Sequence, residues 1–273
     1  MRRDRVVVAA GAFAYRWFLS LFPMVIALLA SAAVLGISHH LVVKLVQGVT
    51  TALPAGAAGV LTTAIDAASR PGGGGSWSTV IVAGLVALWS ATSGMVIVEE
   101  ALDMAYEIGS DRSFVQKRLL ALPLLVASAL LGGAASALVV FGPQIGSAIH
   151  GSVPVAGGVF AALWTALRWI VALLLVGLLF SFLYWLAPNQ RTRWRWVSPG
   201  AVLGTVLWAA ISWAFSFYTT SFDSYAKTYG AFAGVAILIF WLFLTGVAIL
   251  VGAEINAAFE RVETGTTSEV GGS

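Results

Sequence analysis

Apolar residues gather into six long runs, separated by shorter polar stretches. The runs cover residues 17–37, 79–98, 119–141, 159–186, 196–218 and 232–255. About 20 helical residues, each rising 1.5 Å, cross the roughly 30 Å of hydrocarbon in a bilayer. Backbone at that depth must satisfy its own hydrogen bonds, which favours helices. The pattern therefore predicts an all-α, polytopic membrane protein built as a bundle of six transmembrane helices.

Segments rich in lysine and arginine alternate with segments poor in them along this predicted bundle. Eleven of them fall in the first, third, fifth and last segments outside the runs, and three fall in the other segments. Positively charged loops stay in the cytoplasm, so both termini are expected there. Residues 1–15 form a basic N-terminus, residues 16–256 the membrane domain, and residues 257–273 a disordered cytoplasmic tail.

Composition supports a membrane protein and narrows its chemistry. Hydrophobic residues make up 59% of the chain and charged residues 10%, against about 25% charged in a soluble domain. The chain has no cysteine, which excludes disulfides, thiolate catalysis and cysteine-bound zinc. The net charge of +3 follows from the loop pattern, so no nucleic-acid partner is expected.

Two segments between the runs carry patterns of their own. The first outer loop, residues 38–78, shows helical spacing of apolar residues, which predicts short amphipathic helices on the bilayer surface or over the bundle. After the second run, four acids share one helix face: Glu99, Glu100, Asp103 and Glu107. A divalent-cation site is one interpretation of these acids, and a solvated helix face is the favoured one.

Several motifs, spread over residues 12–261, resemble the YihY/BrkB family of bacterial inner-membrane proteins. The positions that carry the resemblance include Tyr15, Ser20, Pro23, Trp89, Pro188, Asn189, Pro199, Gly200, Gly230 and Gly252. The family tends to have asparagine where this chain has Asp103. The resemblance implies a six-helix protein of envelope integrity, with suspected lipid or small-molecule transport and an old ribonuclease label.

The residues argue against that ribonuclease label. Metal-assisted hydrolysis of RNA needs carboxylates or histidines clustered at an accessible site. His39, His40 and His150 all fall in predicted outer loops, away from cytoplasmic RNA. We therefore expect no catalytic residues, no metal and no cofactor, and a protein that is not an enzyme.

Arg168 is the sharpest functional candidate, because it lies inside the fourth apolar run. An ionisable residue within a membrane is a functional hypothesis by default. One interpretation is an arginine that snorkels to the outer interface or forms a structural ion pair. The other is a cation that faces an anionic substrate, with Asp223 as its resting partner.

Two further groups of residues leave similar alternatives. Glu254 is expected near Arg16, either as an ion pair that holds helix ends together or as a cytoplasmic gate. Residues 218–230 are rich in tyrosine, serine and threonine, and Tyr225 and Tyr229 would share a helix face. This segment anchors the chain at the interface or forms a lid over a substrate.

The leading hypothesis is a transporter or flippase-like carrier of a lipid or another anionic amphipathic envelope constituent. Membrane lipids are then its partners. The alternative is a non-transporting scaffold that binds envelope partners through the loop 38–78 and through the acidic helix that follows the second run. No pattern in the sequence specifies an oligomeric state.

Overall fold

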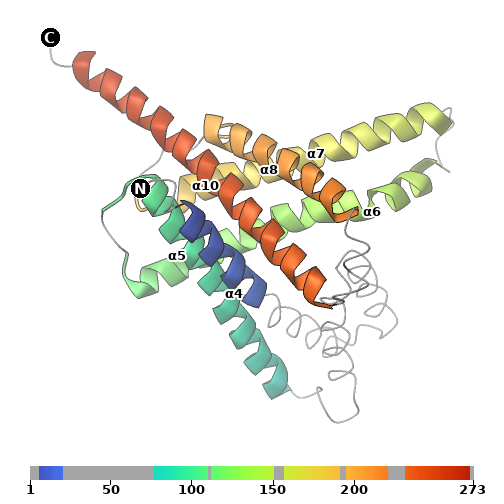
Figure 1. The fold of residues 1–273 in the computed structure, drawn as a ribbon, viewed down its shortest axis with the longest axis horizontal. Coiled ribbons are helices and arrows are strands. Elements are labelled where there is room, and N and C mark those ends of the chain that lie inside the picture. Colours follow the sequence, from blue (N-terminus) through green and yellow to red (C-terminus); the bar gives the residue numbers. More distant parts are fainter. Residues whose placement is uncertain are drawn as a thin grey trace. The chain divides into compact units, whose positions relative to one another are not determined.

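A computed structural model describes residues 6–20, 77–109, 112–150, 157–190, 195–220 and 231–270 of the chain. All regular structure within these residues is helical (Figure 1). Within the described ranges, five helices are long and apolar enough to cross a membrane, and a shorter apolar helix spans Val6–Ser20. The prediction of an all-α polytopic membrane protein is confirmed.

The long helices coincide with the apolar runs. They are α4 (Trp77–Ala105), α5 (Phe114–Ala127), the π-helical turn η1 (Ser128–Gly132), α6 (Gly133–His150), α7 (Gly157–Leu186), α8 (Pro199–Thr220) and α10 (Ala231–Val270). Together α5, η1 and α6 form one continuous apolar span, Phe114–Ile149. The first predicted run is described only as far as Ser20, and the loop 38–78, apart from its last two residues, lies outside the described residues.

Both ends of the chain are more helical than the sequence predicted. The first helix begins at Val6, inside the segment assigned to the N-terminus. The predicted disordered tail is wrong as far as Val270, because α10 continues to that residue. Extending an existing helix adds one hydrogen bond for each residue fixed, and Asn256 Nδ2 also donates to Glu260 Oε1 one turn further on (3.2 Å).

The helices divide into two compact units. The first contains Met1–Val98 and Ala210–Val247, and the second contains Glu99–Ala209 and Ala248–Ser273. The long helices α4, α8 and α10 each contribute one part to each unit. Each unit is therefore assembled from segments that are distant in the sequence.

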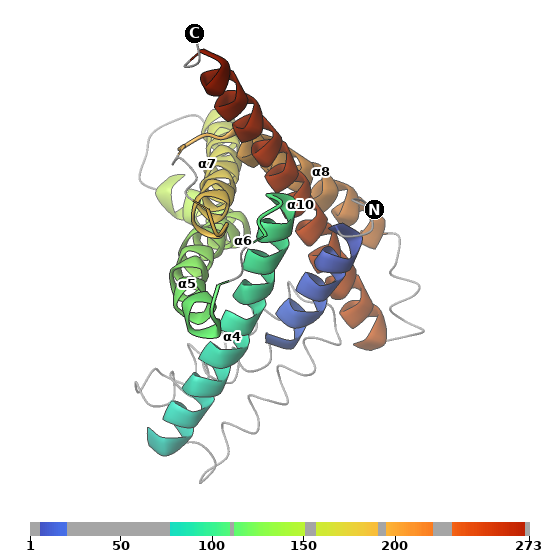
Figure 2. The same cartoon turned by 90° about the vertical axis from the view of Figure 1, so that its left-hand side faces the viewer.

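In the first unit, glycines let the helix Val6–Ser20 approach two neighbours (Figure 2). A Cβ on Gly94 of α4 would lie 3.3 Å from Trp17 Nε1. A Cβ on Gly246 of α10 would lie 2.9 Å from Phe13 Cδ1. Small residues at these contacts bring helices together where the hydrophobic effect does not drive them.

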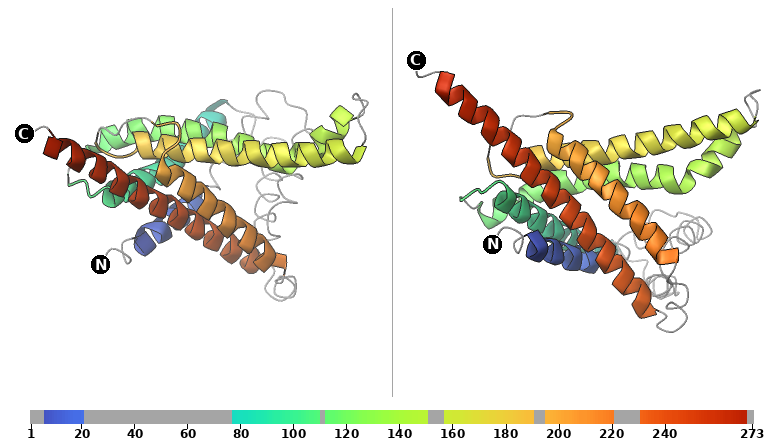
Figure 3. Two further views of the ribbon diagram at one scale, coloured as in Figure 1. Left: turned by 90° about the horizontal axis from the view of Figure 1, so that it is seen from above. Right: turned by 45° about the horizontal axis from the view of Figure 1, so that its top comes forward.

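In the second unit, α6 and α7 run side by side (Figure 3). The turn η1 also lies against α7, since a Cβ on Gly132 would be 3.8 Å from Leu179 Cδ2. Pro123 and Pro143 sit inside α5 and α6 without ending them. Neighbouring helices and local changes of winding make such prolines tolerable in membrane helices.

Candidate functional site

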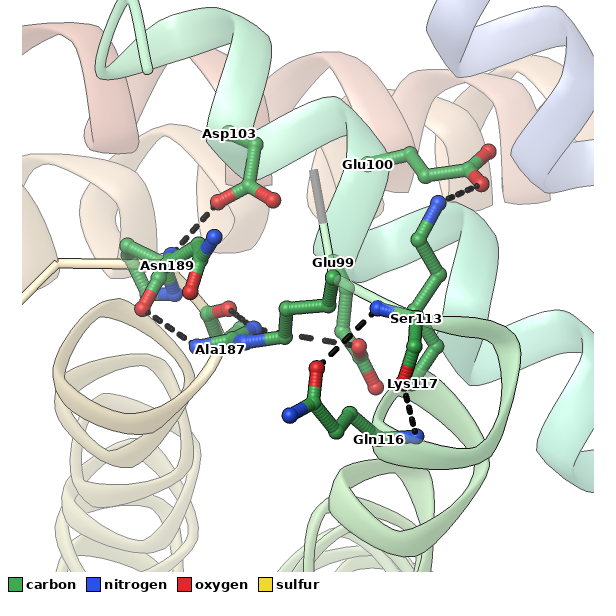
Figure 4. A network of polar contacts seen from close by, with 10 residues as sticks. Glu99, Glu100, Asp103, Ser113, Gln116, Lys117, Ala187 and Asn189 are labelled. Atoms are coloured by element: carbon green, nitrogen blue, oxygen red, sulfur yellow. Dashed lines mark hydrogen bonds and ion pairs between the residues drawn. The ribbon is translucent and has the colours of Figure 1, made fainter. Parts of the chain in front are cut away.

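The end of α4 carries a polar cluster in which Glu99 is the buried member (Figure 4). Its side chain is 1% exposed, so the predicted solvated face is wrong at this residue. Among the residues that the structure describes, neither carboxylate oxygen has a hydrogen-bond partner. The nearest cation is Arg112, whose Nη1 lies 3.9 Å from Glu99 Oε2. The cluster therefore contains a carboxylate that is removed from solvent and whose negative charge would be poorly compensated.

Arg112 donates hydrogen bonds to the turn that follows α7 (residues 187–190), and these contacts are shorter than its ion pair with Glu99. Its Nη1 donates to the carbonyl of Ala187 (2.6 Å), and its Nη2 donates to the carbonyl of Pro188 (2.8 Å). The same turn donates from the other side, since the backbone N–H of Asn189 reaches Asp103 Oδ1 at 2.6 Å. This contact gives Asp103 a role that the sequence left open. Asp103 at the end of α4 and Arg112 just before α5 thus both bind this turn (Figure 4).

The rim of this cluster fixes the start of α5. Ser113 caps the helix, because its Oγ accepts from the backbone N–H of Gln116 while Gln116 Oε1 accepts from the backbone N–H of Ser113. Lys117 then points back to α4 and pairs with Glu100 Oε1 at 2.8 Å. Glu100 is therefore half-exposed and closely paired, whereas Glu99 one residue earlier is buried and forms only the longer ion pair with Arg112 among the described residues.

A second polar network links Tyr106, the residue after α4, with α7 and α10 in the same unit. Asn256 Nδ2 donates to the hydroxyl of Tyr106 (2.8 Å), and the Tyr106 hydroxyl lies 3.5 Å from the carbonyl of Tyr184. The hydroxyl of Tyr184 donates to the carbonyl of Ile249 at 2.7 Å. Burial raises the pKa of Tyr106 above its ordinary value, so this hydroxyl stays a neutral hydrogen-bond donor.

Glycines bring α8 and α10 into backbone contact beside this network. A Cβ on Gly200 would collide with the carbonyl oxygen of Gly252 and lie 2.9 Å from the backbone N of Asn256. A Cβ on Gly252 would in turn lie 2.7 Å from the carbonyl oxygen of Gly200 and collide with the Tyr184 hydroxyl. Both glycines belong to the motifs of the family resemblance, and the contact explains why a side chain is excluded there.

Arg168 lies on α7, where two glycines of α6 make room for it and its neighbour. A Cβ on Gly142 would be 2.9 Å from Arg168 Cδ, and a Cβ on Gly146 would collide with the indole of Trp164. The indole Nε1 donates to the carbonyl of Gly142 at 2.6 Å. Arg168 Nε is buried and has no hydrogen-bond partner in the described ranges, which leave out residues 221–230. The structure thus places Arg168 at the α6–α7 contact and not at a helix end.

The other predicted residues are placed only in part. Pro23, Asp223, Tyr225, Tyr229 and Gly230 lie outside the described residues, so the resting partner of Arg168 and the lid stay predictions.

The remaining sequence candidates divide between exposed and buried positions. Tyr15 and Trp89 are exposed, whereas Ser20 is buried and donates to the carbonyl of Trp17 (2.8 Å). Arg16 is exposed in the first unit and Glu254 is half-buried in the second. Their pairing stays a prediction.

The sequence analysis did not identify Arg112, Tyr106 and Tyr184 as residues that hold helices together. The partners of Arg112 are backbone carbonyls, which no residue type reveals. Gly142 and Gly146 carried a usable signal, since they are spaced four apart like other small pairs in the chain. In the part of the chain that the structure describes, no group of three acids or histidines could hold a metal ion.

Five apolar helices of spanning length, with an arginine inside one of them, define a polytopic α-helical membrane protein. The chain belongs to the BrkB family. The family model described as Virulence factor BrkB matches residues 1–271, which confirms the resemblance seen in the motifs.

Curated relatives extend over most of the chain. The ribonuclease-like protein YfkH of Bacillus subtilis is 36% identical over 248 residues, 91% of this chain and 88% of its own length. A UPF0761 membrane protein of Vibrio campbellii is 28% identical over 265 residues, 96% of this chain and 80% of its own length. Another UPF0761 membrane protein, from Chromohalobacter salexigens, is 32% identical over 66% of this chain and 42% of its own length. No solved structure matches the chain.

Proposed function

We propose that this protein is a transporter, or flippase-like carrier, of a lipid or another anionic amphipathic constituent of the cell envelope. It acts in the bacterial inner membrane with both termini in the cytoplasm, which the distribution of lysine and arginine favours. In this proposal it contributes to envelope integrity by moving a substrate and not by catalysing a reaction. One relative has a ribonuclease-like name. The sequence analysis found no set of residues in this chain that would support that activity.

Arg168 is the observation that carries the proposal. Arginine keeps its charge in proteins, and placing it within a span costs at least about 2.5–3.5 kcal/mol on insertion scales. The small residues of α6 leave room for its side chain, and its Nε has no hydrogen-bond partner among the described residues. A guanidinium binds phosphate or carboxylate through parallel hydrogen bonds, so an anionic headgroup is the ligand that suits this site.

The test is lipid translocation in reconstituted vesicles. Fluorescent phosphatidylglycerol serves as the anionic probe and fluorescent phosphatidylcholine as the zwitterionic one, with dithionite reporting the outer leaflet. We expect Arg168→Ala to slow the anionic probe about tenfold or more, because a hydrogen bond to a charged group contributes about 1.5–3 kcal/mol. Arg168→Lys keeps the charge without the planar fork and should retain part of the rate.

The matched control is Arg261→Ala. Arg261 is an exposed arginine of α10 that pairs with Glu107, and its loss should leave translocation near the wild-type rate. An Arg168→Ala protein that inserts normally and moves phosphatidylglycerol as fast as the wild type would contradict the proposal. A wild-type protein that moves neither probe would favour a scaffold that binds envelope partners.

A further inference from the structure

Glu99 is a buried carboxylate that nothing in the proposed transport role uses. It is 1% exposed, and within the described part of the chain both of its oxygens lack a hydrogen-bond partner. An ionised carboxylate in such a site loses its hydration without gaining hydrogen bonds in return. The neutral, protonated form avoids most of that cost. The arrangement in the structure is therefore the one that suits a protonated Glu99.

The nearest cation is engaged elsewhere in this arrangement. Arg112 donates at 2.6 Å to Ala187 and at 2.8 Å to Pro188, while its distance to Glu99 is 3.9 Å. Main-chain carbonyls are neutral acceptors, and a carboxylate is a stronger acceptor for a guanidinium. Ionisation of Glu99 would therefore make it a competitor for the same guanidinium.

The other charged groups around Glu99 already have partners. Those that face it among the described residues are Arg112 from the loop, Lys117 from α5, and Glu100 and Asp103 from its own helix. Lys117 pairs with Glu100 at 2.8 Å, and Asp103 accepts from the backbone N–H of Asn189 at 2.6 Å. Glu99 is thus the acid of this cluster whose protonation state would change the hydrogen bonds of Arg112.

We propose that Glu99 is a proton-binding site whose ionisation decides which partner Arg112 holds. When Glu99 carries a proton, Arg112 stays on the carbonyls of Ala187 and Pro188 and fixes the turn between α7 and α8. When Glu99 loses the proton, Arg112 moves to the carboxylate and releases these carbonyls. Asp103 then holds the turn at Asn189 alone. The proposal is independent of lipid transport and stands if that function fails.

The experiment follows the position of the turn as pH changes. The chain has no cysteine, so a spin-label pair can be introduced without a background thiol. Val126→Cys on α5 and Gln190→Cys in the turn are both exposed positions of the same unit. Pulsed EPR on the full chain in lipid nanodiscs gives the distance distribution at acid and alkaline pH. We expect two distributions that interconvert as pH rises.

Two variants should lock opposite states. Glu99→Gln imitates the protonated acid and should keep the acid distribution at every pH. Arg112→Gln removes the guanidinium and should give the alkaline distribution at every pH. Glu100→Gln is the matched control, since it removes a neighbouring acid that is paired with Lys117, and it should keep the pH response.

Three results would overturn the proposal: a wild-type distribution that does not change with pH, a Glu99→Gln protein that still responds, or an Arg112→Gln protein that responds as the wild type does. If Glu99→Gln does not fold, the Arg112→Gln result decides the question by itself.

Discussion

The effects on stability of removing the Tyr184 hydroxyl and of adding a side chain at Gly204 should depend on each other. A Cβ on Gly204 would lie 2.9 Å from the Tyr184 hydroxyl oxygen, 3.2 Å from Phe180 Cδ2 and 3.4 Å from the carbonyl oxygen of Ala248. Only the first of these contacts is below 3.0 Å, a separation that real Cβ atoms essentially never show. Gly204→Ala should therefore be costly mainly because of one oxygen atom.

The magnitudes follow from three terms. Tyr184→Phe removes a buried hydrogen bond of 2.7 Å to Ile249, which should cost about 1 kcal/mol in a membrane protein. Gly204→Ala gains about 0.5–1 kcal/mol of helix propensity and loses about 1–3 kcal/mol to overpacking. Without the hydroxyl the overpacking largely disappears. The double variant should thus be more stable than the sum of the single effects by about 1–2 kcal/mol, within the range measured for contacting residues.

Reversible unfolding by SDS in mixed micelles, followed by circular dichroism, measures all four proteins of this cycle. Gly133→Ala is the matched control, because a Cβ there would have no neighbour within 4 Å. It should combine additively with Tyr184→Phe, within about 0.3–0.5 kcal/mol. Equal costs of Gly204→Ala with tyrosine and with phenylalanine at position 184 would refute the reasoning. So would a coupling of the same size for Gly133→Ala.

Two more substitutions test the N-terminal cap of α5 and the packing of α6 against α7. Ser113→Ala removes the capping box of α5 and should cost about 1 kcal/mol in the same unfolding assay, with faster amide exchange in the first turn; an unchanged exchange rate would argue against the cap. Gly146→Ala forces the indole of Trp164 to move and should cost about 1–3 kcal/mol, whereas Gly133→Ala on the same helix should be neutral or stabilising. Equal effects at the two glycines would contradict the packing described for α6 and α7.

The apolar runs predicted the helices because length and hydropathy are local properties of the chain. The boundaries of the helices were harder to predict from the sequence. Residues 119–141 were predicted as one span, yet the helical segment extends over Phe114–Ile149. The capping box at Ser113 starts it earlier, and Pro143 does not end it. Proline alone is a weak stop signal when a helix is supported along its length by neighbours.

The polar cluster at the end of α4 could not be read from the sequence. Glu99 and Glu100 are adjacent acids on one predicted face, and only the fold decides that one is buried and the other half-exposed. The hydrogen bonds of Arg112 depend on the backbone carbonyls of Ala187 and Pro188, far away in the chain. Arg168 could be singled out in advance, because a charge inside an apolar run is itself a local signal.

The π-helical turn η1 sets the rotational phase of everything that follows it. Such a turn accommodates one residue more than an α-helix of equal length, and each residue rotates a helix by about 100°. The turn thereby absorbs one residue, so deleting one residue from Ser128–Gly132 should restore regular winding and leave Gly142 and Gly146 facing Trp164. Regular α-helical winding with all five residues kept would instead rotate these two glycines away from α7 by about 100°. The local winding, and not only the kind of residue, therefore determines which side of α6 meets its neighbour.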